Sequence, residues 1–166
     1  MGLETVARKA GVSRQAIYLH FSSRADLIRA LHLRVNVHDV APAMARVWAR
    51  RTARAGLDAF VAASAEVIPR ISGIADALAP SRTDPDLEAT GEEPKESRYA
   101  DCLRMGEWLE SDGVLANGVT ARDAADVLCM MVSIPSYEIL VVDRGWSPQR
   151  WTRWVRDALY RALLSS

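Results

Sequence analysis

Residues 3–21 read LETVARKAGVSRQAIYLHF. The segment 3–10 consists of good helix formers, with small apolar residues at the three- and four-residue spacing of one helix face. Gly11 follows where the end of a helix favours the left-handed conformation, and Ser13 can cap a second helix over 14–19. Two short helices joined by so tight a turn are typical of a helix-turn-helix, which puts its second helix into the DNA major groove, and also of a plain helical hairpin.

The residues after the turn favour the first interpretation. Residues 17–27 read IYLHFSSRADL and lead into a long amphipathic helix. Together with AGVS at 10–13, this order resembles the TetR family of bacterial transcriptional regulators, whose signature is roughly AGVSxxx(I/L)Yx(H/Y)Fx(S/D)KxxL. Arg24 replaces the usual lysine and keeps its charge, while Ala25 stands where an acidic residue is frequent.

The resemblance implies an all-α, TetR-like fold in two parts. Residues 1–37 would form the helix-turn-helix DNA-binding head with its connecting helix, and 38–166 a helical ligand-binding and dimerisation domain. In the family an extra helix precedes the helix-turn-helix and covers its core, whereas only two residues precede Leu3. We therefore expect a head without its usual first helix. The alternative function is a helical small-molecule-binding or scaffolding dimer that has lost DNA binding for this reason.

The resemblance also implies which side chains contact double-stranded DNA. Polar and cationic side chains at the start of the second helix would lie near base edges, and others around it would bond the phosphate backbone. The residues expected near the bases are Arg14, Gln15 and Ala16. Those expected on the phosphate backbone are Thr5, Ser13, Tyr18, His20 and Arg24.

The distribution of charge agrees with a nucleic-acid partner at one end of the molecule. The chain has no net charge, but residues 1–34 hold six basic and two acidic residues, which leaves a net charge of −4 on the remainder. A basic head on an acidic body favours docking on DNA by that end. A solvated helix face or a second anion contact would explain the further cluster of Arg46, Arg50, Arg51 and Arg54.

Length and composition are those of an ordinary globular protein, with 49% apolar and 25% charged residues among 166. No apolar run is long enough to cross a bilayer and no signal-peptide pattern follows Met1, so we expect a cytoplasmic protein without a membrane partner. The two cysteines, Cys102 and Cys129, are expected to be reduced core residues.

The sequence offers little for enzyme chemistry. None of its three histidines has a cysteine or carboxylate at metal-site spacing, and neither a GxSxG motif nor a phosphate-binding glycine loop is present. We therefore expect no enzymatic activity, no cofactor and no metal site.

Local signals predict the remaining helices. We expect helices over 24–37, 41–53, 57–68, 70–79, 96–111, 120–143 and 148–164. Pro42 can occupy the first turn of its helix, Gly56 should break the helical pattern, and Pro69 should bend the chain. A shift in composition predicts an acidic loop from Pro80 to about Pro94.

Three helix starts have recognisable caps in the C-terminal half. Thr120 with Asp123 resembles a capping box, and Ser147 precedes a proline that suits the first helical position. Pro135 removes a backbone donor and should divide its helix, with Ser133 available as the new cap.

The last two predicted helices are apolar over much of their circumference. This fits either a simple core or half of a four-helix bundle completed by a second subunit. The order SxPxYxxLxxxxGWSPxxWxxW over 133–154 resembles the C-terminal half of many TetR-like proteins, whose last two helices form the homodimer interface. The expected interface residues are Leu128, Val132, Ile139, Trp151, Val155 and Leu159.

The resemblance further implies a small-molecule effector, whose identity the sequence does not give. A small, largely apolar ligand between the body helices would shift the helix 24–37 and spread the two heads of a dimer that reads a near-palindrome. The pocket candidates, each of which also fits a core position, are Tyr99, Met105, Trp108 and Met131.

Overall fold

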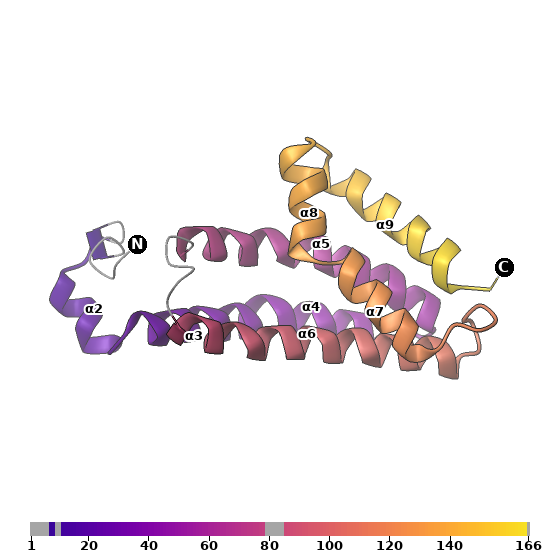
Figure 1. The fold of residues 1–166 in the computed structure, drawn as a ribbon, viewed down its shortest axis with the longest axis horizontal. Helices are drawn as coiled ribbons and strands as arrows, with labels where there is room; N and C mark the ends of the chain where they lie inside the picture. Colours follow the sequence, from indigo (N-terminus) through magenta and orange to yellow (C-terminus); the bar gives the residue numbers. More distant parts are fainter. Residues whose placement is uncertain (1–6, 9–10, 79–84, 166) are drawn as a thin grey trace.

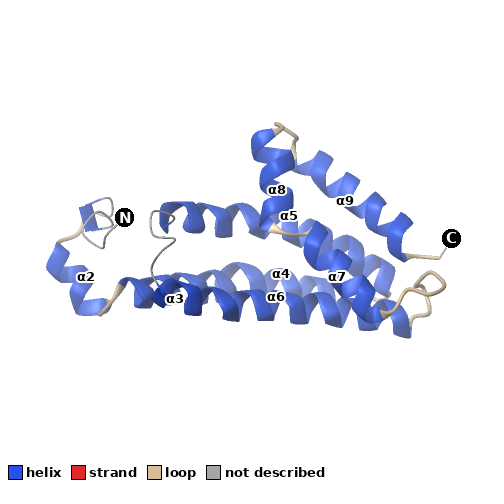
Figure 2. Ribbon diagram, viewed as in Figure 1, coloured by secondary structure: helices blue, strands red, loops and turns tan. Residues whose placement is uncertain are grey.

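The computed structural model of the chain describes residues 7–8, 11–78 and 85–165. These ranges fold into helices and loops, as Figure 2 shows, and their single extended contact is an isolated bridge between Leu115 and Leu164. The all-α fold expected from the sequence is confirmed. In chain order the helices are α2 (Arg14–His20), α3 (Arg24–Val35), η1 (Asn36–Val40), α4 (Ala41–Trp48), α5 (Ala53–Leu78), α6 (Pro85–Ser111), α7 (Ala121–Met131), α8 (Ile134–Tyr137), η2 (Glu138–Asp143) and α9 (Pro148–Leu163).

The molecule is elongated, with α2 at one end and the C-terminus at the other (Figure 1). Helices α3, α4 and α6 run along one long side, and α5 lies between them and the α8–α9 pair. Most buried side chains form one body core that includes Trp151, Leu57 and Met105. A separate, smaller cluster lies under α2. Within the described ranges no single helix is long and apolar enough to span a membrane; α7 and the α8–η2 segment meet that test only as a pair, bent by 49°.

The connecting helix differs from the expectation of a break before Pro42. The backbone stays helical from α3 through η1 into α4, so Arg24–Trp48 is one continuous unit of structure. In η1 the Ala41 N–H donates to the Asn36 carbonyl, one residue further back than in an α-helix. This wider π-helical turn accommodates Pro42, which would otherwise clash with the preceding turn. The predicted domain boundary at residues 37 and 38 falls inside that turn.

Helix α5 contains both Gly56, where a break was expected, and Pro69, where a bend was expected. Tertiary packing explains the glycine: the ring of Trp108 lies so close that a β-carbon at residue 56 would be 2.4 Å from Cζ3 of the indole. Around Pro69 the helix buries Val67 and Ile68, so burial on the same helix face offsets the cost of the proline.

The predicted acidic loop is wrong over 85–94, which belong to α6. A proline suits the first position of a helix, so a start of α6 at Pro85 is compatible with the sequence. The predicted loop residues 80–84 lie outside the described residues.

The predicted caps of the C-terminal half are confirmed. Thr120 and Asp123 form a reciprocal capping box at the start of α7. Ser133 accepts a hydrogen bond from the Ser136 N–H and caps α8, which begins after the predicted division. Ser147 accepts a hydrogen bond from the Arg150 N–H and caps α9. Each cap satisfies a backbone N–H that the first helical turn leaves unbonded.

Candidate functional site

The turn before α2 has the hydrogen bonds of a helix terminus closed by glycine. Gly11 has φ 68°, and its N–H donates to the Arg8 carbonyl at 3.3 Å. The Val12 N–H donates to the Ala7 carbonyl at 3.1 Å, which completes the Schellman pattern. A residue with a β-carbon would be strained at this φ, so Gly11 sets the direction in which the chain enters α2.

Helix α2 is capped at its first turn and held by a small core. The Ser13 hydroxyl accepts a hydrogen bond from the Ala16 N–H at 3.0 Å. Ile17 is buried together with Ala7 and with Leu27 of α3. This cluster joins the residues before the turn, α2 and α3, and so fixes which face of α2 reaches the solvent.

The outer face of α2 carries most of the predicted DNA-contacting side chains that the structure describes. Gln15 and His20 are exposed, Tyr18 is 47% exposed and Ala16 is half-buried. Leu19 is also exposed, at 78%, which sequence analysis did not single out. The exposed side chains of α2 therefore lie where the wall of a DNA groove could contact them.

The other predicted DNA contacts are described less fully. Ser13 is exposed, although its hydroxyl is already engaged as the cap. Arg14 begins α2 and Arg24 begins α3, so both stand at helix N-termini, but their side chains lie outside the description. Thr5 lies outside the described residues.

The first turn of α3 is fixed by a small polar network. Ser23 caps it by accepting from the Asp26 N–H at 3.1 Å, and Arg29 pairs with the Asp26 carboxylate at 2.9 Å. The pKa of Asp26 lies below its usual value because the carboxylate accepts a hydrogen bond from Ser22 and, to a smaller extent, interacts with Arg29. The carboxylate is therefore ionised and internally paired at neutral pH.

In the body, a shallow hollow lies at the end of the connecting helix, lined by Trp48, Arg104 and Trp108. The Arg104 guanidinium stands 4.3 Å from the centroid of the Trp48 ring, and the rings of Trp48 and Trp108 are 6.3 Å apart. Trp48 also contacts Phe60, and Trp108 is held against Gly56. The hollow thus combines two indole rings of fixed position with one cation.

The four predicted pocket residues are not gathered in one cavity. Met105 is fully buried in the core, and Met131 is half-buried against it. Tyr99 donates its hydroxyl to Asp126 at 2.9 Å, a bond that raises the pKa of Tyr99. Of the four predicted residues, Trp108 is the one that lines the hollow. It lies nine residues from Tyr99, about 13 Å along α6.

Sequence analysis missed Trp48 and Arg104 as lining residues. The four-residue spacing of Arg104 and Trp108 on one helix face was an available signal. The contribution of Trp48 comes from another helix, so only the packing of α4 on its neighbours reveals it.

Five of the six predicted interface residues require a correction. Their side chains have exposed fractions of 0–3% within the single chain, so they pack in its own core and cannot contact a partner; they are Leu128, Val132, Trp151, Val155 and Leu159. Ile139 is 54% exposed and remains available. The helical face of α9 that sequence analysis assigned to a partner is instead the face buried on α5, α7 and η2.

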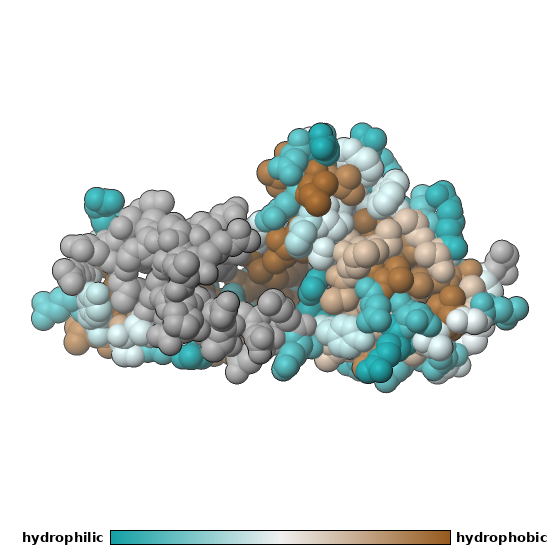
Figure 3. All heavy atoms as spheres, in the orientation of Figure 1, coloured by the Kyte–Doolittle hydropathy of each residue, from teal (hydrophilic) through white to brown (hydrophobic). Residues whose placement is uncertain are grey.

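Four large apolar side chains of α7, η2 and α9 remain exposed. We call them the outer patch; they are Met130, Ile139, Val142 and Trp154, which are 48–67% exposed. Trp146 packs edge-on against Trp154, with 6.0 Å between the two ring centroids. The Arg150 guanidinium lies over the ring of Trp146, 3.9 Å from its centroid. Apolar atoms gather over the α8–η2 segment and over α7 in Figure 3.

The predicted arginine cluster is divided among different contacts. Arg46 pairs with Glu66 at 2.7 Å, and Arg54 donates to the Ser165 carbonyl at 2.7 Å. Arg50 and Arg51 are exposed. The four side chains therefore do not form one cationic surface. Across the part of the chain that is described, no three His, Cys, Asp or Glu side chains are grouped to hold a metal ion.

Comparison with known protein families agrees with the geometry of the head. Residues 1–31 match the family model of bacterial regulatory proteins of the tetR family. The chain carries a TetR-type DNA-binding region. The match assigns a TetR-type helix-turn-helix to this region, as the sequence indicated. No curated protein sequence matches the chain significantly.

Two solved structures have the same TetR-like fold over the whole chain. A proposed transcriptional regulator from Saccharomonospora viridis, in complex with choline, superposes with a TM-score of 0.77 over 97% of this chain and 85% of its own, at 18% identity. NalD, the secondary repressor of the MexAB-OprM multidrug efflux pump in Pseudomonas aeruginosa, gives 0.73 over 100% and 88%, at 21% identity. The likeness establishes the fold of head and body together.

Proposed function

We propose that the protein is a ligand-responsive repressor that binds a near-palindromic operator as a homodimer. The observation that carries this proposal is α2: a capped helix with Gln15, Tyr18 and His20 exposed on a basic head. Arg14, Gln15 and Ala16 contact base edges, and Thr5, Ser13, Tyr18, His20 and Arg24 bond the phosphates. Two copies of α2 enter successive major grooves about 34–36 Å apart.

The outer patch is the surface through which two copies associate. Large apolar side chains left exposed on a surface are a common mark of a protein contact. The patch lies on α7, η2 and α9, the C-terminal helices for which the sequence pattern indicated a dimer. A twofold contact there buries Val142 and Trp154 of both copies, and the core residues behind them keep their places.

The effector binds the hollow at Trp48, Arg104 and Trp108. Indole rings offer a stacking surface for a flat apolar group, and the guanidinium offers two parallel donors to an anionic group. The related structure from Saccharomonospora viridis holds choline, which supports a small-molecule effector in this fold.

Effector binding acts on DNA through the connecting helix. Trp48 is the last residue of α4, and the same continuous helix begins at Arg24 beside α2. A ligand that moves Trp48 therefore displaces the head, and it favours release if the displaced arrangement fits the operator less well. A transcription factor of this kind acts in the cytoplasm and has no catalytic residues.

An electrophoretic mobility-shift assay decides whether the protein binds DNA. The protein is titrated into DNA from upstream of its own gene at several salt concentrations, with scrambled DNA of the same composition as control. We expect sequence-selective binding that weakens steeply with salt, because the basic head displaces counterions from the phosphates. Absence of selective binding at every salt concentration contradicts the proposal and leaves a helical dimer without operator activity.

A further inference from the structure

Two π-helical turns interrupt the helices of this chain, and they lie on opposite sides of α5. The turn η1 falls in the connecting helix, and η2 follows α8 in the segment that carries part of the outer patch. None of the residues in these two described turns is buried. A π-turn holds one residue more than an α-turn and is less stable, so its presence often marks a functional position.

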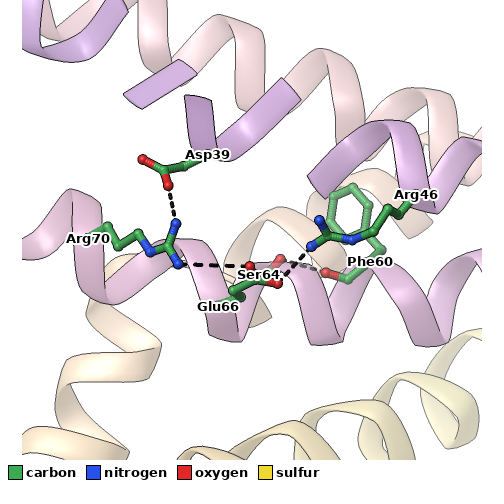
Figure 4. Close-up of polar contacts among 6 residues, drawn as sticks. All are labelled: Asp39, Arg46, Phe60, Ser64, Glu66 and Arg70. Atoms are coloured by element: carbon green, nitrogen blue, oxygen red, sulfur yellow. Dashed lines mark hydrogen bonds and ion pairs between the residues drawn. The ribbon is translucent and has the colours of Figure 1, made fainter. Parts of the chain in front are cut away.

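On one side, α5 is joined to η1 by charged side chains. Arg70 pairs with Asp39 of η1, and its other nitrogen lies 3.9 Å from Glu66 (Figure 4). Glu66 in turn pairs with Arg46 of α4 at 2.7 Å. The connecting helix is therefore held to α5 at η1 and again further along.

On the other side, α5 is joined to η2 by one hydrogen bond. The Ser72 hydroxyl donates to the Glu138 carboxylate at 2.6 Å. Ser72 and Arg70 are two residues apart on a helix, so their side chains leave it in nearly opposite directions. Pro69 directly precedes them, and a proline at that position removes a backbone hydrogen bond from this turn. The segment 69–72 thus contacts both π-turns directly after the turn of α5 that lacks one backbone hydrogen bond.

Stability alone does not account for this arrangement. The side chains of Arg70, Glu66 and Arg46 are 48–56% exposed and that of Asp39 is 21% exposed, and ion pairs at a surface contribute about 0–1 kcal/mol. Contacts of this size are nevertheless large enough to change the populations of two arrangements severalfold. A π-turn supplies two such arrangements, because its conversion to an α-turn moves the register by one residue and rotates the following helix by about 100°.

We propose that the segment 69–72 of α5 couples the two π-turns, so that a change of register in η2 changes the register of η1 and with it the direction of the head. Contacts that η2 makes with a second copy are in this way transmitted to the connecting helix by Glu138, Ser72, Arg70 and Asp39. The coupling is a property of the single fold and does not depend on DNA or an effector.

Hydrogen exchange of backbone amides, measured by mass spectrometry on the full chain without DNA, tests the coupling. Ser72→Ala breaks the bond to Glu138, and we expect the amides of η1, on the far side of α5, to exchange about threefold faster, as for loss of one net hydrogen bond. Reciprocally, Asp39→Asn should speed exchange in η2. Reciprocity is required of any true coupling between two sites.

A matched control separates coupling from general loosening of α5. Ser64→Ala removes a hydroxyl from the same helix, but Ser64 donates only to the Phe60 carbonyl of α5 itself (Figure 4). It should therefore leave the exchange of both η1 and η2 unchanged. The proposal is overturned if Ser72→Ala affects η2 alone and Asp39→Asn affects η1 alone, or if Ser64→Ala accelerates η1 to the same degree as Ser72→Ala.

Discussion

The ring of Trp108 packs directly on Gly56, with no room between them for a β-carbon, which would lie 2.4 Å from the indole Cζ3 atom. Gly56→Ala should therefore destabilise the protein by about 1–3 kcal/mol, the usual cost of overpacking. Without this steric contact, replacing a helical glycine by alanine would instead stabilise the protein by up to about 1 kcal/mol. Urea unfolding measures the difference. Adding Trp108→Leu should remove most of the penalty, and an equal penalty in both backgrounds would contradict the role of the indole.

Gly106 permits the close approach of α6 to the start of α7. A β-carbon there would lie 2.2 Å from the carbonyl oxygen of Ala121, a backbone atom that cannot rotate away. We expect Gly106→Ala to lower the free energy of unfolding by more than Gly56→Ala does. Ala100→Gly at an exposed position of the same helix is the comparison, because it changes helix propensity without a steric contact. A loss no larger than about 1 kcal/mol for Gly106→Ala would show that the two helices separate easily.

Two substitutions in α2 should affect operator binding differently. Arg14→Ala removes a base-edge contact, so it should relax specificity at one operator position and weaken binding there by about 1–3 kcal/mol. Tyr18→Phe removes a phosphate contact and should weaken binding to all sequences alike. Fluorescence anisotropy against a set of single-base operator variants measures both. If Tyr18→Phe changes the order of preferred sequences, the assignment of Tyr18 to the backbone is wrong.

Association through the outer patch depends on Trp154, which is 48% exposed. Trp154→Glu places a charge in the outer patch of each copy, and we expect a monomer at micromolar concentration in sedimentation velocity. The neighbouring Arg153 is also exposed, and Arg153→Glu should leave the dimer intact. A dimer that survives Trp154→Glu would place the interface elsewhere on the surface.

The buried thiol of Cys102 predicts a loss of stability at high pH. Burial, followed by the neighbouring Cys129, raises the pKa of Cys102 from 9.0 to about 12. Because the folded pKa lies above the unfolded one, the contribution is complete below pH 9 and is lost as the pH rises from 9 towards 12. In urea unfolding at pH 7 and about 10.5, the stability difference between the wild type and Cys102→Ala should become smaller at the higher pH. A constant difference would contradict a buried neutral thiol.

The helix caps and the glycine turn of this chain were predictable from the sequence. The caps at Ser13, Thr120, Ser133 and Ser147 were each predicted from a few neighbouring residues, and each is present. A cap is one hydrogen bond between a side chain and a backbone N–H two or three residues away, so the information it needs lies within that window. The turn at Gly11 was predictable for the same reason, since its φ is a property of one residue.

The expected breaks and the acidic loop show where local reasoning fails. A break was expected before Pro42 and a bend at Pro69, but a π-turn accommodates the first proline and burial of the helix face offsets the second. Residues 85–94 have the composition of a loop and yet belong to α6. In each case the helix as a whole outweighs the preference of a single residue or of a short polar segment.

The sequence by itself determined the head: a glycine turn, a serine cap and the order of residues 10–27 specify a TetR-type helix-turn-helix, because all of these act within one or two helical turns. Only the tertiary structure decided which face of α9 is core and which is surface, since both faces carry tryptophan and the choice depends on what α5 and α7 present to it. The same holds for the hollow between Trp48 and Trp108 and for the contacts of α5 with η1 and η2. These join residues 31 to 66 positions apart, and no local pattern records such pairs.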